Sequence, residues 1–423
     1  MKHLLLSSFL LLTLVSRAQA DWPQFRGPNG QGHATAKGLV HQWSENSNIY
    51  WKAAVPGEGW SSPVIVGNHI WMTTATDKGK SLRALCYAND SGKLLHNVEL
   101  FTLKKTDRRH AKNSFATPTP IIHQGRVYVH FGYRGTACLT MDGKVVWKHA
   151  KLKFHQAYSG ASSPIIFGNM LILTCDGGDN QFVATLNLKN GDVIWKTKRQ
   201  HLERAYERNR TARQGWQGYF TMGYTTPLVV ASDGRFQIVS PAADHIAAYD
   251  SETGKELWWY PYNGFSLVAR PVYGHGLVYT IGVVQQGKHL LHAFRPSARG
   301  KVGKEDIAWV MTKGIPHVPS PLLIGDRLYL LHDKGIAMSV NAKTGKLIWQ
   351  KRIGGNYSAS PMYADGKIIL VSEEGKTTVI KPAEAFTPLA TNQLKGRFLA
   401  SPAASGKAIY LRSDKFLYRI ERK

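Results

Sequence analysis

A short phrase recurs along this chain, and its recurrence limits the fold more than any other feature of the sequence. Each copy opens with a proline, usually after a small polar residue, and continues as an apolar strand, a turn and a second strand; "SSPIIFGNMLIL" at 162–173 is one example. The opening prolines are Pro63, Pro120, Pro164, Pro227, Pro271, Pro321, Pro361 and Pro402. Repetition at this spacing predicts one body built from packed copies, because a single copy cannot bury its own apolar face.

A glycine with a tryptophan four residues later marks a second fixed point of the unit. The pairs are Gly143/Trp147, Gly191/Trp195, Gly254/Trp258 and Gly345/Trp349. We expect each glycine to close a turn between two strands, where a residue without Cβ accepts a positive φ. Each tryptophan then falls on the outermost strand, where its large ring can pack against the neighbouring unit.

The segments between these markers indicate an all-β chain. They are short, alternating and rich in Val, Ile and Tyr, and almost no helical pattern separates them. A unit of four strands with a turn signal about every eight to twelve residues is typical of a propeller blade. We therefore predict an eight-bladed β-propeller of four-stranded antiparallel blades, and a β-solenoid is the competing fold.

The two ends of the chain favour the closed ring over the solenoid. "NIYWKAAV" at 48–55 resembles an outermost strand, yet no inner strands precede it. The last unit ends at "SDKFLYRIERK", 413–423, without an outer strand of its own. We predict that the N-terminal strand completes the last blade and so closes the ring.

The first twenty residues have the pattern of a secretory signal peptide. Lys2 and His3 precede an apolar stretch that ends at "AQA", and this stretch is too short to span a bilayer comfortably. We expect cleavage after Ala20, a periplasmic or extracellular protein, and no transmembrane segment in the mature chain. The predicted organisation is a signal peptide at 1–20, a lead-in at 21–38 and a single propeller domain at 39–423.

Three connections between units are much longer than the others, and they indicate where a binding face lies. They follow His96, Trp147 and Trp195, and each leads from the outer strand of one blade to the inner strand of the next. Connections of one kind emerge on one face of a propeller, so we expect these loops to lie together. Loops on a rigid scaffold commonly carry binding residues.

Two of these loops are strongly basic in a chain whose net charge is +26. Guanidinium groups bind phosphate, sulfate and carboxylate through two oxygens at once, and an aromatic ring can stack on a sugar or a base. The candidate anion-binding residues are Lys104, Lys105, Arg108, Arg109, Lys198, Arg199, Arg204, Arg208, Arg210, Arg213 and Trp216. In the alternative interpretation the loops are solvated, and a short helix over 200–213 pairs Arg199 with Glu203 and Glu207 with Arg210.

No motif in the sequence identifies a catalytic or metal site. "CDGGDNQ" at 175–181 offers two carboxylates, Asp176 and Asp179, which is fewer than the ligands that Ca²⁺ prefers. A tight turn between strands is the favoured interpretation there. The sequence lacks HExxH, a P-loop and GxSxG.

The segment "AYDSETGKELW", 248–258, resembles the tryptophan-docking repeat of propellers that bind pyrroloquinoline quinone (PQQ). Together with "DWPQFRGPNGQG" at 21–32, it makes the chain similar to the PQQ-binding-like β-propeller repeat proteins of planctomycete and verrucomicrobial type, and more distantly to the BamB family. The resemblance covers nearly the whole mature chain, and it implies the fold more strongly than the function.

The resemblance leaves two main functions open, and a third, a part in outer-membrane protein assembly like that of BamB, is disfavoured because no cysteine for a lipid anchor follows the expected cleavage site. PQQ dehydrogenases of this fold carry an adjacent cysteine pair, a calcium site and a catalytic aspartate, and no motif here aligns with them. We therefore expect a binding or scaffolding module that recognises a protein partner or an acidic polymer, such as an envelope glycan or a nucleic acid. The alternative is a PQQ-dependent oxidoreductase with a divergent site, for which PQQ and calcium would be the cofactors.

Overall fold

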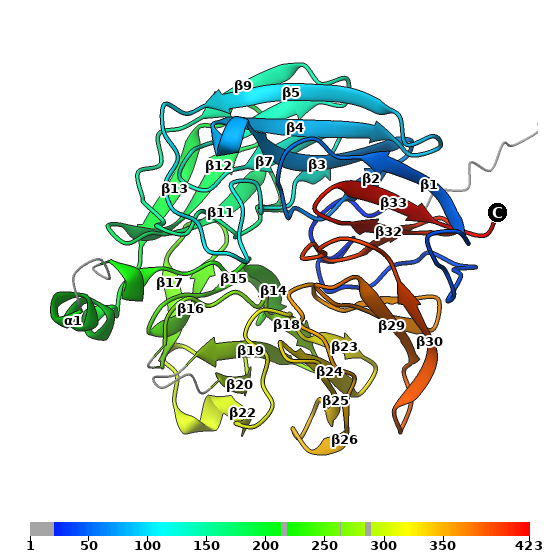
Figure 1. Ribbon diagram of the computed structural model, residues 1–423. Helices are drawn as coiled ribbons and strands as arrows, with labels where there is room; N and C mark the ends of the chain where they lie inside the picture. Colours follow the sequence, from blue (N-terminus) through cyan, green and yellow to red (C-terminus); the bar gives the residue numbers. More distant parts are fainter. Residues whose placement is uncertain (1–20, 213–217, 263, 284–288) are drawn as a thin grey trace, which may run out of the picture.

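The computed structural model describes residues 21–212, 218–262, 264–283 and 289–423, and these form eight β-sheets arranged in a ring (Figure 1). The predicted eight-bladed propeller is confirmed. The four main strands of each sheet are antiparallel, and in seven of the eight sheets the chain runs through these four strands in order from the ring axis outward. The predicted signal peptide lies outside the described residues.

The first four blades follow the predicted repeat. Blade one contains β2 (Val64–Val66), β3 (His69–Thr76), β4 (Ser81–Ala88) and β5 (Leu94–Thr102). Blade two contains β6 (Ile121–His123), β7 (Arg126–His130), β8 (Thr136–Thr140) and β9 (Val145–His149). Blade three contains β10 (Ile165–Phe167), β11 (Met170–Asp176), β12 (Gln181–Asn187) and β13 (Val193–Lys198). Blade four contains β14 (Leu228–Ser232), β15 (Arg235–Pro241), β16 (His245–Asp250) and β17 (Glu256–Pro261), with the short β21 (Gly300–Lys301) added in parallel at its edge.

The other four blades complete the ring. Blade five contains β18 (Val272–Gly274), β19 (Leu277–Val283), β20 (His289–Phe294) and β22 (Ile307–Met311). Blade six contains β23 (Leu322–Ile324), β24 (Arg327–His332), β25 (Ile336–Asn341) and β26 (Leu347–Arg352). Blade seven contains β27 (Met362–Ala364), β28 (Lys367–Val371), β29 (Lys376–Lys381) and β30 (Thr387–Gln393). Blade eight contains β31 (Ala403–Ser405), β32 (Ala408–Arg412), β33 (Phe416–Ile420) and, from the N-terminal side of the chain, β1 (Ile49–Ala54).

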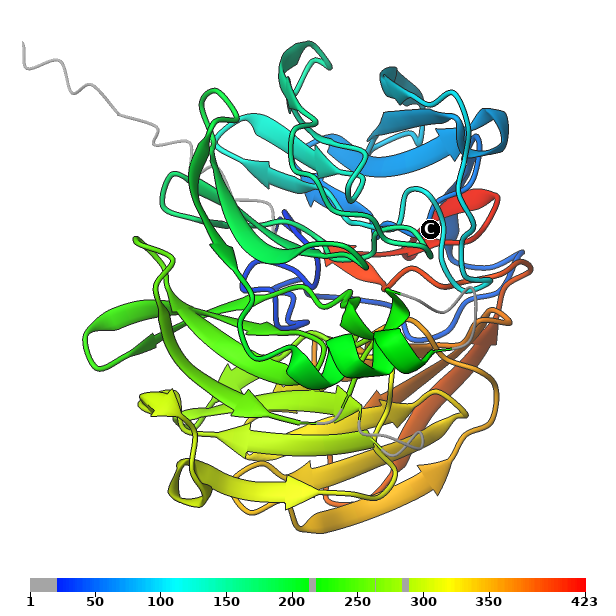
Figure 2. The same cartoon turned by 90° about the vertical axis from the view of Figure 1, so that its left-hand side faces the viewer.

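Strand β1 closes the ring as the sequence predicts. It pairs antiparallel with β33, placing Trp51 opposite Arg419, and Figure 1 shows the blue strand beside the red ones. Helical segments are few among the described residues. They are α1 (Glu203–Thr211), which Figure 2 shows in the foreground of the view, and the short 3₁₀ turns η1 (Asp77–Gly79), η2 (Tyr219–Thr221) and η4 (Lys304–Asp306).

A ring of hydrogen bonds joins the blades around the axis. The residue before each opening proline is Ser or Thr in seven blades, and in six of them its hydroxyl accepts a hydrogen bond from the matching amide of the preceding blade. Ser62 N–H donates to Thr119 Oγ1 at 2.9 Å, and Ser320 N–H donates to Ser360 Oγ at 3.0 Å. Blade five carries Arg270 at this position instead.

The lead-in crosses one end of the central channel, on the side of the turns between first and second strands. Trp22 exchanges two backbone hydrogen bonds of 2.8 Å with Ile65 of blade one. Further along, Ala34 N–H donates to Tyr363 O of blade seven, and Lys37 N–H donates to Gly406 O of blade eight. Residues 21–38 therefore form a floor under the channel, opposite the face on which the long loops emerge.

Candidate functional site

The connections that lead from one blade to the next converge on one cavity at the mouth of the central channel. This cavity has a volume of about 360 Å³, and residues from all eight of these connections line it. Phe25 of the lead-in forms part of its floor. The expectation that the enlarged loops share one face is met, because His110, Tyr158 and Tyr219 come from the three long loops and line the same space.

Aromatic rings form part of the cavity wall. Tyr158 and Tyr219 meet edge to face with centroids 5.3 Å apart, and Tyr219 packs on Phe265 at 5.2 Å. Burial raises the pKa of Tyr224, so its hydroxyl stays protonated at neutral pH. Across the mouth, the guanidinium of Arg397 lies 5.7 Å from the ring of Trp60. Rings held by their neighbours offer apolar contact area with little loss of conformational entropy.

The loop that follows β5, residues 103–113, reaches over blade eight to blade seven. Lys112 Nζ forms an ion pair with Glu373 Oε1 at 2.7 Å, and Ser358 Oγ donates to the same oxygen at 2.6 Å. Arg397 Nη2 donates to Ala111 O at 3.0 Å. These bonds hold His110 at the mouth, where burial, then Lys112 and a further histidine, lower the pKa of its imidazole.

Sequence reasoning did not identify the residues of this cavity. The signal that could have found part of it is the Ser or Thr before each opening proline, because Ser62, Thr119 and Ser163 all line the wall. The aromatic residues carry no such marker, since they lie in loops outside the repeat. Most polar side chains that face the cavity are neutral, and Asp333 is the one carboxylate in its described lining.

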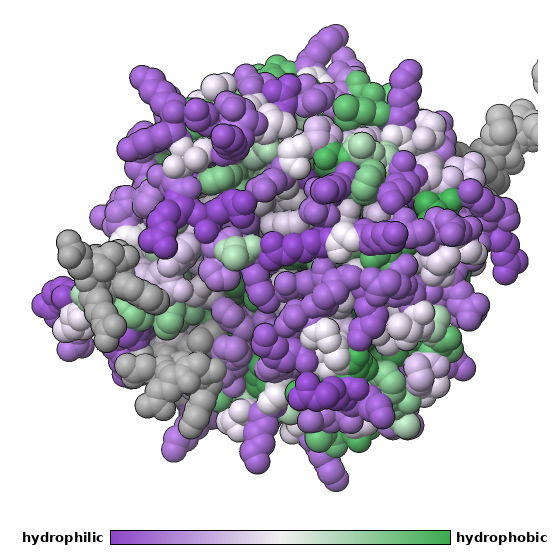
Figure 3. Space-filling model, viewed as in Figure 1, coloured by the Kyte–Doolittle hydropathy of each residue, from purple (hydrophilic) through white to green (hydrophobic). Residues whose placement is uncertain are grey.

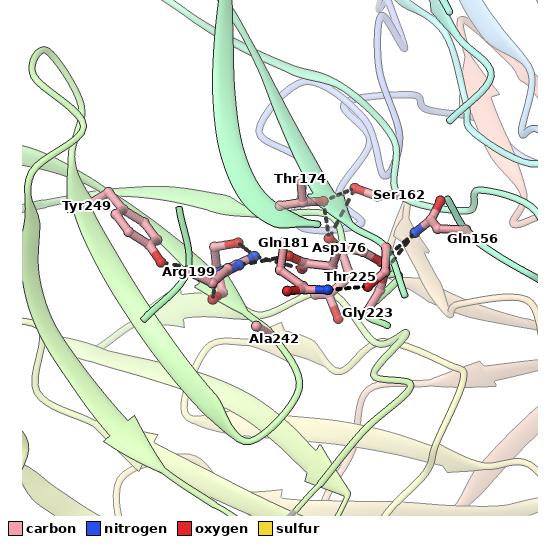
Figure 4. Close-up of polar contacts among 12 residues, drawn as sticks. Gln156, Ser162, Thr174, Asp176, Gln181, Arg199, Gly223, Thr225, Ala242 and Tyr249 are labelled. Atoms are coloured by element: carbon pink, nitrogen blue, oxygen red, sulfur yellow. Dashed lines mark hydrogen bonds and ion pairs between the residues drawn. The ribbon is translucent and has the colours of Figure 1, made fainter. Parts of the chain in front are cut away.

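Of the sequence-predicted anion-binding residues, Arg199 is the most deeply buried. Its Nε and Nη2 donate to the two carboxylate oxygens of Asp176, each at 2.8 Å, and its Nη1 donates to Ser240 O at 3.0 Å (Figure 4). Burial raises the pKa of Asp176. Burial alone would lower the pKa of Arg199, but Asp176 and then Tyr249 outweigh it and hold that pKa above its ordinary value. This pair fixes the start of the long loop to blade three.

Two other candidates pair with carboxylates closer to the surface. Arg208 forms an ion pair with Asp244, and Arg109 Nη2 lies 2.8 Å from Glu58 Oε2. The remaining described candidates are exposed: Lys104, Lys105, Arg108, Lys198, Arg204 and Arg210. Arg213 and Trp216 lie outside the described residues. None of the described candidates lines the central cavity, and their role in anion binding stays a prediction.

The alternative interpretation of the basic loops is met in one respect. A helix does form within 200–213, namely α1. Arg199 pairs with Asp176 rather than with Glu203, because the β12–β13 hairpin carries its side chain into the blade instead of onto the helix. The helix adds to the outside of the loop face and contributes Ala205 to a small apolar cluster with Leu202 and Ala243.

The residues of the mouth do not fit a calcium-held PQQ. Ca²⁺ takes about six to eight oxygen ligands. Asp333 already accepts the amide hydrogens of His317 and Val318, at 2.6 and 3.2 Å. In the described parts of the chain, no group of three or more His, Cys, Asp or Glu side chains could hold a metal ion. Asp176, considered above as a calcium ligand, is engaged by Arg199.

The ring and its axial cavity define this protein as an eight-bladed β-propeller. The chain belongs to the family described as outer membrane protein assembly factor BamB, whose model matches residues 32–151, 81–213 and 199–423. A BamB of Alkalilimnicola ehrlichii is 24% identical over 236 residues, which cover 53% of this chain and 52% of that protein. The alignment therefore spans about half the length of that relative.

Solved structures show the same fold at low identity. BamB from Moraxella catarrhalis superposes with a TM-score of 0.59 at 14% identity, covering 88% of this chain and 99% of that one. A quinohemoprotein alcohol dehydrogenase from Comamonas testosteroni gives 0.66 at 11% identity, covering 96% and 81%. Within the described residues, no helix has the length and apolar character needed to cross a membrane.

Proposed function

We propose that this protein is an envelope-associated binding module that receives a segment of a protein partner at the mouth of its central channel. One observation carries the proposal: all eight inter-blade connections meet around a single cavity of about 360 Å³. That volume lies in the range of about 300–1,000 Å³ typical of binding pockets. It is large enough for one or two side chains of a partner, with the rest of the segment lying across the loop face.

The chemistry of the mouth suits a peptide segment. Trp60, Tyr158 and Tyr219 supply aromatic contact area, and tryptophan and tyrosine are enriched where interface energy is concentrated. Hydroxyl groups and Lys112 supply hydrogen bonds around them. The remainder of the face seen in Figure 3 is mostly hydrophilic, with apolar residues in small separate groups. The matched family, named for outer membrane protein assembly, supports a protein partner in the cell envelope.

Other ligands receive less support from the same residues. An acidic polymer would need exposed cations at the binding surface, but the described anion-binding candidates lie outside the cavity lining and three of them are paired with carboxylates. Oxidoreductase chemistry would need a cofactor site, and the residues of the mouth do not supply the oxygen ligands for calcium. A binding role remains the function that the geometry supports best.

Site-specific photo-crosslinking in cells that naturally make the protein tests this proposal. A photoreactive phenylalanine analogue replaces Trp60 at the mouth or, as a control, Val310, which is 44% exposed on the outer strand of blade five. We expect a discrete adduct with an envelope protein from position 60 and none from position 310. Equal labelling from both positions, or no adduct from either, contradicts the proposal.

A further inference from the structure

Two arginine side chains lie buried together beneath the cavity, and neither has an acidic partner within the part of the chain that the structure describes. Arg26 belongs to the lead-in, and Arg270 stands before Pro271, where the seven other blades carry Ser or Thr. Their exposed fractions are 2% and 3%. Among the ion pairs of residues 21–212, 218–262, 264–283 and 289–423, none includes either residue.

The hydrogen bonds of both guanidinium groups go to neutral carbonyl oxygens. Arg26 Nη2 donates to Gln31 O at 2.8 Å and to Pro321 O at 2.6 Å. Arg270 Nη1 donates to Phe25 O at 3.0 Å. The Nε and Nη1 of Arg26 and the Nε of Arg270 are closed off from solvent and have no hydrogen-bond partner.

Arg412 is also buried, singly, and bonds neutral oxygens of Ser61 and Thr73, whereas Arg199 shows how this chain supplies a counter-charge to a buried arginine. It is buried to a similar degree, and Asp176 meets it with two hydrogen bonds. At the channel floor, by contrast, burial lowers the pKa of Arg270 to about 10. Burial and the neighbouring Arg270 lower the pKa of Arg26 to about 9. Both groups therefore stay charged at neutral pH, and two desolvated like charges are costly without a counter-charge.

We propose that Arg26 and Arg270 bind a small inorganic anion, of the charge and size of chloride, at the floor of the central channel. The unpartnered N–H groups would donate to it, as buried cations in proteins usually meet a negative partner. Glycines pack against both guanidinium groups, so only an ion of few atoms could be accommodated beside them. A Cβ on Gly30 would lie 2.3 Å from Arg270 Nη1, and a Cβ on Gly32 would lie 2.8 Å from Arg26 Nη2.

Such an anion would also join two parts of the fold. One ligand comes from the lead-in and the other from blade five, so the bound ion would hold the floor against the ring. This proposal stands apart from the binding of a protein partner at the mouth, because the lining of that cavity includes neither Arg26 nor Arg270.

Crystals of the mature protein grown in sodium bromide test the site directly. Bromide replaces chloride and is located by its anomalous scattering. We expect a peak within hydrogen-bonding distance of both Arg26 and Arg270. Electron density at the two arginines that refines as water, without an anomalous peak, overturns the proposal. This test uses the wild-type protein and so does not depend on whether a variant folds.

Thermal unfolding provides a second measurement. At constant ionic strength, replacing gluconate by chloride should raise the Tm of the wild type by about 3 °C, because a ligand of the folded state stabilises it. Arg270→Ser, which restores the residue type of the other blades, should abolish the chloride dependence. Arg412→Met, at another buried arginine whose Nη1 bonds Ser61 and Thr73, should retain it. A wild type whose Tm does not respond to chloride contradicts the proposal.

Discussion

Trp195 of blade three packs its indole ring onto Gly254 of blade four, and its Nε1 donates to Ser251 O at 3.3 Å. The same relationship recurs between Trp147 and Gly191 and between Trp309 and Gly345. The predicted contact of each tryptophan with its neighbouring unit is therefore present, and it explains why the partner residue is glycine. The tryptophan of one blade and the glycine of the next form a single joint.

We predict that Gly254→Ala destabilises the protein by about 2–4 kcal/mol. Its φ is +72°, and an added Cβ would lie 2.5 Å from Trp195 Cε3, so backbone strain and overpacking add together. Urea unfolding measures the loss. Gly234→Ala is the matched control, because Gly234 lies in the same blade with φ +71° and has nothing within 4 Å. Equal losses for both variants would show that the tryptophan contact contributes nothing.

The hydrogen bonds that join neighbouring blades through the Ser or Thr before each opening proline predict a second effect on stability. Thr119→Val removes the acceptor for the buried Ser62 N–H while keeping the shape of the side chain. We expect a loss of about 1–3 kcal/mol, since a buried donor is left without a partner. Thr391→Val, at an exposed position on β30, should change the urea midpoint very little. If Thr119→Val unfolds at the same urea concentration as the wild type, the hydrogen bonds between blades do not contribute to stability.

The Asp176–Arg199 pair predicts a larger loss. Asp176→Asn leaves a buried guanidinium without its counter-charge and should cost about 3–5 kcal/mol in urea unfolding. Asp192→Asn, at an exposed carboxylate of the same blade, is the control. Combining Asp176→Leu with Arg199→Met should recover much of the stability. If the double variant is no more stable than Asp176→Asn, the cost does not arise from the uncompensated charge.

Buried histidines predict how stability depends on pH. Burial lowers the pKa of His130 and of His292 to about 4 in the folded protein. The unfolded chain takes up these protons below about pH 6.5, so the stability is fully present above that pH and falls between pH 6.5 and 4. His292→Phe should reduce the slope of unfolding free energy by up to about 1.4 kcal/mol per pH unit. His41→Phe, at an exposed position, should keep the wild-type slope, and identical slopes for all three proteins would contradict this account.

The architecture was open to prediction because its determinants are local and repeated. Gly345 and Trp349 mark the outer hairpin of blade six, Pro361 opens blade seven, and eight copies of the proline phrase leave few other folds. The closing strand could be predicted because no inner strands precede residues 48–55 and the last unit has no outer strand of its own. The common face of the long loops followed from the order of strands in a blade.

The site was less predictable because its contacts join distant residues. Arg199 had the appearance of a surface cation, yet its partner Asp176 lies at the end of β11 and meets it only after the hairpin has formed. Lys112 and Glu373 are brought together only by closure of the ring. Phe25 and Arg26 became part of the channel floor because the lead-in crosses all the way beneath it, which no local pattern indicates.

The most direct test of the central claim is the dissociation constant between the mature protein and the partner captured by crosslinking at the mouth. We predict that Trp60→Ala raises this constant at least about 30-fold, as expected for an aromatic anchor in a cavity, while Val310→Ala leaves it unchanged. Undiminished affinity of a correctly folded Trp60→Ala protein would show that the mouth of the channel is not where the partner binds.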